Sequence, residues 1–78
     1  MDKDIVTQLL RDILDDRGVP KNIKESLEGI IGILDAKVSD NEKASQIISI
    51  LDDAANDPNI SFSARTLIWN TVSAMEGM

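Results

Sequence analysis

Apolar residues recur three or four positions apart along almost the whole chain, which is the spacing of one face of an α-helix. Runs in which apolar and polar residues alternate, as in half-buried strands, are absent, and only Phe62 and Trp69 are aromatic. The pattern therefore predicts an all-α protein. A chain of 78 residues suffices for one small core, so we expect residues 1–78 to form a single domain.

Turn-forming residues divide the chain into four predicted helices. Gly18 and Pro20 separate the first two, because glycine suits the turn past a helix end and proline suits a first helical position. Ser39 and Glu42 form a capping box, in which each side chain bonds the other's backbone amide, so a third helix starts there. The turn around Pro58 ends it. The predicted helices cover about residues 4–16, 20–37, 39–55 and 61–75.

Two internal similarities point to a duplicated helical hairpin. The tetrapeptide Ile-Leu-Asp-Asp occurs at 13–16 and at 50–53, an offset of 37 residues. The apolar positions of the second and fourth helices match with an offset of 41, as from Ile23 to Ala64. A second loop with four extra residues accounts for both offsets. Because short connections make neighbours antiparallel, we predict a four-helix up-and-down bundle made of two hairpins, with a solenoid-type stack as the alternative.

The repeated tetrapeptide also carries a candidate metal site. We expect the pairs Asp15-Asp16 and Asp52-Asp53 to end the first helix of each hairpin, at the same end of the bundle. One interpretation is a magnesium or calcium contact made by these carboxylates with Asp57. The other is that they hydrogen-bond their own loop backbone. The second fits better, because adjacent helical residues diverge by ~100° and no hard-ion loop pattern surrounds them.

Gly29 and Gly32 fall inside the predicted second helix, without the strand and Lys-Ser/Thr pair of a phosphate-binding loop. Each costs ~0.5–1 kcal/mol relative to alanine in a helix. We therefore expect a neighbouring helix to approach closely at these positions.

The composition argues against several classes of function. The absence of cysteine and histidine removes disulfides, the usual zinc sites and Ser-His triads, so we predict neither an enzyme nor a cofactor. The net charge is −6 and the basic residues are scattered singly, which predicts no nucleic-acid binding. Without a signal-peptide pattern or an apolar run of ~18 residues, we expect no membrane association and a cytoplasmic location.

The predicted fourth helix carries the most informative surface. Its aromatic stripe, about a quarter turn from the core line, consists of Phe62, Arg65, Trp69 and Glu76. Arg65 precedes Trp69 by four residues, so its guanidinium can lie over the indole. Either Trp69 packs into a crevice against a neighbouring helix with Arg65 covering it, or the stripe is an association surface, since Trp and Arg are enriched in interface hot spots.

The second half of the chain resembles a known family. The segments that carry the resemblance are NDPN at 56–59 and ARTLIWN at 64–70, with VPKNI at 19–23 upstream. They are similar to a small archaeal family of uncharacterised proteins, number 0147 of its series. The chain departs from it at 60–61, where Ile-Ser replaces the family's usual Met-Pro. The resemblance implies an archaeal, cytoplasmic four-helix protein and brings no activity or catalytic residue.

These observations predict a non-enzymatic protein-interaction or scaffold module. Its partner is another protein or, in a homodimer, a second copy, with the aromatic stripe as the candidate contact. The alternative is a divalent-metal-dependent activity or sensor that uses the aspartates at one end of the bundle, namely Asp15, Asp16, Asp52 and Asp53.

Overall fold

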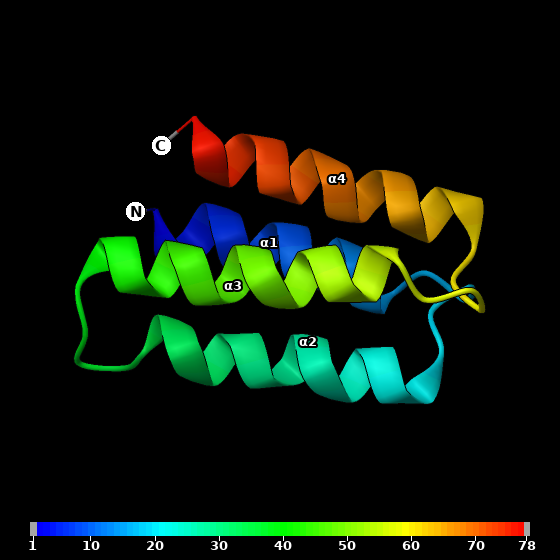
Figure 1. Cartoon of the computed structure of the whole chain (residues 1–78), viewed down its shortest axis with the longest axis horizontal. Coiled ribbons are helices and arrows are strands. Elements are labelled where there is room, and N and C mark those ends of the chain that lie inside the picture. The colour runs from blue at the N-terminus through cyan, green and yellow to red at the C-terminus, as the bar shows by residue number, and fades with distance from the viewer. Residues whose placement is uncertain (1, 78) are drawn as a thin grey trace.

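The computed structural model describes residues 2–77 as a four-helix bundle (Figure 1). The helices run alternately up and down, as α1 (Lys3–Leu14), α2 (Lys21–Leu34), α3 (Asp40–Ala55) and α4 (Phe62–Glu76). Each helix packs against its chain neighbours, and α4 closes the bundle against α1. This confirms the predicted all-α bundle of two hairpins, whereas a solenoid-type stack would place α1 against α3. Within residues 2–77 no helix is long and apolar enough to span a membrane.

Side-chain caps explain where three of the helices begin. The side chains of Asp2, Ser39 and Ser61 each accept a hydrogen bond from the backbone amide three residues later. α2 instead begins directly after Pro20, which has no side-chain cap bond. The predicted helix starts are therefore correct to within one residue. The predicted ends of the first two helices are two or three residues too late, because the chain leaves helical structure after Leu14 and Leu34.

The core consists of apolar side chains from all four helices and from two loops. Thr71 is the one buried polar side chain among residues 2–77, and its hydroxyl donates to the Leu67 carbonyl oxygen at 2.9 Å. The helical spacing of apolar residues predicts that Ile5 lies on the apolar face of the first helix together with Val6 and Leu10, but Ile5 is 50% exposed, so that prediction is wrong. The buried apolar residues are Val6, Leu10, Ile13, Val19, Ile23, Leu27, Ile30, Leu34, Ile47, Leu51, Ala54, Ala55, Ile60, Ala64, Ile68 and Met75.

The two hairpins repeat with a single offset of 41 residues. Both inter-helix loops of the hairpins, 15–20 and 56–61, contain six residues, so the predicted longer second loop is wrong. The second Ile-Leu-Asp-Asp lies inside α3, which continues to Ala55, so Asp52-Asp53 does not end that helix. Eight pairs of buried residues obey the offset: Val6 and Ile47, Leu10 and Leu51, Ile13 and Ala54, Val19 and Ile60, Ile23 and Ala64, Leu27 and Ile68, Ile30 and Thr71, Leu34 and Met75.

The two glycines inside α2 face solvent. A Cβ atom added to Gly29 or Gly32 would meet no other atom within 4 Å, and both residues are exposed. The expected close approach of a neighbouring helix is therefore wrong. Helix packing does not require glycine at either position.

Candidate functional site

The aromatic stripe lies on the outer surface of α4. Phe62 and Trp69 are seven residues apart, which is about two helical turns, or ~10 Å along the same side of the helix. Their exposed fractions are 79% and 53%, whereas Ile68, next to Trp69 in sequence, is fully buried. Trp69 is thus half exposed rather than enclosed in a crevice between helices. The structure leaves both aromatic side chains of the chain available for contact.

Arg65 and Glu76 differ in their relation to the aromatic pair. The Arg65 side chain is half-buried, and its Nε donates a hydrogen bond to the Ala55 carbonyl oxygen at 2.9 Å. It thereby satisfies a carbonyl at the C-terminal end of α3, where intrahelical partners run out. Glu76 is exposed, two turns beyond Trp69 at the end of α4. The stripe therefore combines exposed aromatic rings, one anchored cation and one carboxylate at its far end.

The first hairpin offers a comparison for the stripe, because α2 occupies the place in the first hairpin that α4 occupies in the second. With the offset of 41, Phe62, Arg65 and Trp69 correspond to Lys21, Lys24 and Glu28 of α2. The two helices bury equivalent faces, yet α2 carries charged side chains where α4 carries the stripe. Large aromatic rings at these positions are thus not a requirement of the bundle.

Asp16 joins the loops of the two hairpins. Its Oδ1 accepts from the Gly18 backbone amide at 2.7 Å and from the Ser61 hydroxyl at 3.3 Å, and its Oδ2 accepts from the Ser63 hydroxyl at 2.8 Å. The Ser61 amide in turn donates to the Gly18 carbonyl oxygen at 2.9 Å. Figure 1 shows the two loops meeting at one end of the bundle. Asp16 therefore hydrogen-bonds the loop backbone, as one of the two interpretations of the aspartates predicts.

The other candidate metal ligands do not assemble around Asp16. Asp15 is the exposed C-cap of α1, and Asp52 and Asp53 are exposed within α3. Asp57 forms a turn of its own, in which its Oδ1 accepts from the Asn59 amide at 2.8 Å. Among residues 2–77 no three acidic side chains are grouped so that they could hold a metal ion. The geometry therefore gives no observation that favours the metal-dependent alternative.

Replacing Asp16 by asparagine should destabilise the protein at neutral pH and change its response to acid. Hydrogen bonds from the Gly18 amide and then the Ser63 hydroxyl, with a smaller one from Ser61, hold the pKa of Asp16 below its ordinary value of 3.8. A carboxylate with a lowered folded-state pKa contributes stability above about pH 3.8, and that contribution is lost as the pH falls through the folded pKa.

The stability difference between wild type and Asp16→Asn should therefore shrink on acidification. Urea unfolding at neutral pH and at about pH 3 measures it. Asp15→Asn is the matched control, because the Asp15 carboxylate makes no hydrogen bond within residues 2–77. A difference that is independent of pH would contradict this account.

Similarity to known proteins extends over nearly the whole chain. The model of the uncharacterised protein family UPF0147 matches residues 3–78. The chain belongs to this family. A UPF0147 protein of Methanothermobacter thermautotrophicus is 43% identical over 74 residues, covering 94% of this chain and 72% of the relative. One of Methanosarcina mazei is 42% identical over 73 residues, covering 88% and 75%, and one of Aeropyrum pernix is 34% identical over 73 residues, covering 92% and 80%.

Family membership confirms the resemblance seen in the sequence. No solved structure matches the chain. Because the family is described as uncharacterised, membership brings no activity and no functional residue to this chain.

Proposed function

We propose that this chain is a non-enzymatic protein-interaction module and that the aromatic stripe of α4 is its docking surface. The observation that carries the proposal is the exposure of Phe62 and Trp69 on one side of a helix whose counterpart, α2, is charged there. Burying an aromatic side chain in an interface removes 150–250 Å² from water, and such residues act as hot spots. The hydrogen bond from Arg65 Nε to the Ala55 carbonyl oxygen fixes this side chain on the same side of α4 as the two rings.

The charge of the second hairpin favours a different protein over a second copy as the partner. Residues 40–77 contain six acidic residues and two basic ones. Both cations already donate to backbone carbonyls, Lys43 to Leu34 and Arg65 to Ala55, each at 2.9 Å. Only Glu76 of the six acidic residues lies on α4 itself, and the others belong to α3 and the 56–61 loop. A twofold dimer across α4 would still bring together two hairpins with the same negative net charge. A partner with basic residues around an apolar contact complements it in charge.

The proposal is tested by comparing variants that differ in which exposed apolar residue is removed. The full chain, the double variant Phe62→Ser/Trp69→Ser and the control Ile5→Ser are immobilised and exposed to a lysate of the source organism. Ile5 is half exposed on α1, outside the stripe, so its variant controls for a general loss of surface hydrophobicity. Each captured protein is then purified, and its dissociation constant for the three chains is measured.

The expected result is a protein that binds wild type and Ile5→Ser equally and binds the double variant at least ~30-fold more weakly. Loss of a hot spot costs ~2 kcal/mol or more, which corresponds to that factor. Thermal unfolding should change little through Phe62, which is 79% exposed, and more through Trp69, whose side chain is about half buried, so it is measured to show that the double variant stays folded. Partners that bind all three chains alike would contradict the proposal. Light scattering at two concentrations covers the remaining case: a wild-type dimer that the double variant splits would assign the stripe to a second copy.

A further inference from the structure

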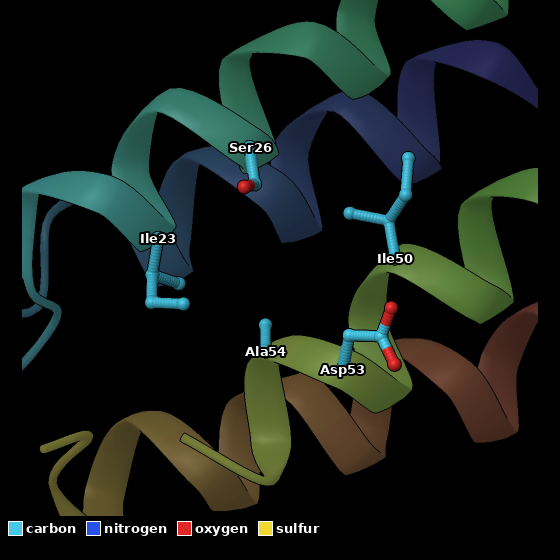
Figure 2. A pocket seen from close by; sticks show the side chains of 5 residues that line it. All are labelled: Ile23, Ser26, Ile50, Asp53 and Ala54. Atoms are coloured by element: carbon cyan, nitrogen blue, oxygen red, sulfur yellow. The ribbon is translucent and has the colours of Figure 1, made fainter. Parts of the chain in front are cut away.

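A groove lies between α2 and α3, on a different side of the molecule from the aromatic stripe of α4. It has a volume of about 250 Å³ and is shown in Figure 2. Ile23 and Ser26 of α2 form one wall, and the other wall consists of Ile50, Asp53 and Ala54 of α3. Three of its five lining residues are apolar, and the Asp53 carboxylate lies beside Ile50 (Figure 2).

The internal repeat explains why this interface is open. The offset of 41 relates the packing of α2 on α3 to the packing of α4 on α1. Ser26 and Ala54 occupy the positions at which the other interface has Leu67, half-buried, and Ile13, fully buried. Of the lining residues only Ile23 is larger than its counterpart. Two small side chains thus leave space that their counterparts fill elsewhere in the same bundle.

The carboxylate of the groove has no partner in the part of the chain that the structure describes. Asp53 is exposed, and its carboxylate forms no hydrogen bond or ion pair within residues 2–77. None of the other lining residues is charged. Lys43, the basic residue of α3, is bound to the Leu34 carbonyl oxygen. Apolar walls beside one free carboxylate suit an aliphatic chain that ends in a cation.

We infer that this groove receives a lysine side chain of a partner protein. The methylene stem lies against Ile23, Ile50 and Ala54, and the ammonium group pairs with Asp53. At about 250 Å³ the groove is smaller than the 300–1,000 Å³ of most small-molecule sites. A free amine or a short lysine peptide would bind only weakly, at about millimolar concentration, because it loses translational and rotational freedom for few contacts. A side chain of a docked protein loses only rotamer freedom and therefore binds more favourably. The inference rests on the proposed protein-binding function, and it uses residues outside the aromatic stripe.

Amide chemical shifts of the ¹⁵N-labelled full chain provide the test. Two peptides are titrated, acetyl-Gly-Lys-Gly-amide and its analogue with norleucine in place of lysine. The lysine peptide should cause saturable shifts centred on the amides of the five lining residues, and the norleucine peptide should bind at least ~3-fold more weakly. Asp53→Asn should weaken lysine-peptide binding about 3- to 5-fold, as expected for an exposed ion pair. Ser26→Leu, which introduces the side chain of its counterpart Leu67, should abolish it.

The repeat supplies the matched control, because Asp12 of α1 is the counterpart of Asp53. Asp12→Asn should leave binding unchanged. The double variant Phe62→Ser/Trp69→Ser should also keep it, so failure of the stripe as a docking surface and failure of the groove are separately visible. Three results would each overturn the inference: no saturable shifts at the groove, equal binding of both peptides, or equal weakening by Asp12→Asn and Asp53→Asn.

Discussion

Replacing Leu51 by alanine should lower the free energy of unfolding by about 2–5 kcal/mol, and Leu10→Ala should cost nearly the same. Both side chains are fully buried, and they occupy equivalent positions of the repeat in α3 and α1. Each replacement removes apolar surface from the core and leaves a cavity that the neighbouring helices fill only in part. A protein of this length is stable by about 4–12 kcal/mol, so either loss is a large fraction of the total.

Urea unfolding, followed by the helical circular dichroism signal, measures both variants. Gln46→Ala is the control on α3, because Gln46 is exposed and its replacement should change stability by less than about 0.5 kcal/mol. Similar costs at Leu10 and Leu51 would show that the two hairpins contribute equally to the core. A large loss of unfolding free energy for Leu51→Ala with a small loss for Leu10→Ala would contradict the prediction. The two hairpins would then share the pattern of buried residues but not their contributions to stability.

Features set by near neighbours in sequence could be predicted. The N-cap of α3, in which the Ser39 hydroxyl accepts from the Glu42 amide, and the helical spacing of apolar residues both depend on groups a few positions apart. Of the predicted capping box, only this half is found among the hydrogen bonds of residues 2–77. Such local features fixed the number of helices, most of their starts and most of the buried face. The bundle followed from the short connections between the helices.

The end of α3 could not be read from the repeated tetrapeptide, because the same four residues meet different continuations. After Asp16 the chain continues with Arg17 and Gly18, whereas Asp53 is followed by Ala54 and Ala55. Alanine favours the helix, and both alanines are buried, so α3 gains a further turn. Tertiary packing thus places the second Ile-Leu-Asp-Asp inside a helix. The identity of the two tetrapeptides indicated an offset of 37 residues, whereas the buried residues repeat with an offset of 41.

The candidate sites depend on contacts between distant segments. Helical phase places Trp69 at the edge of the buried face, and only the neighbouring helix decides whether a crevice exists there. The groove requires Ser26 and Ala54, small residues on two helices, to lie opposite each other. The offset of 41 carries a signal for the groove, because the larger residues Leu67 and Ile13 stand at the positions equivalent to Ser26 and Ala54.

Gly18→Ala should destabilise the protein by about 1–3 kcal/mol, as overpacking does. No residue among 2–77 has a positive φ, so the backbone at Gly18 accepts alanine, and the lower entropy of the unfolded chain would by itself favour the change. Steric overlap outweighs this entropic gain and makes the change in stability unfavourable, because a Cβ at Gly18 would overlap the Cβ and Oγ of Ser61. Ser61 cannot easily move, since its amide donates to the Gly18 carbonyl at 2.9 Å and its hydroxyl caps α4.

A double-mutant cycle with Ser61→Gly isolates this contact. Glycine retains most of the N-cap preference, so as a cap Ser61→Gly should cost only a few tenths of a kcal/mol, with a further loss from the hydrogen bond to Asp16. In the Ser61→Gly background, Gly18→Ala should cost much less than in the wild type. Gly29→Ala is the control for introducing alanine: because its Cβ meets open space, it should stabilise α2 by about 0.5–1 kcal/mol. An equal cost of Gly18→Ala in both backgrounds would mean that the contact between the two loops is not what requires glycine at this position.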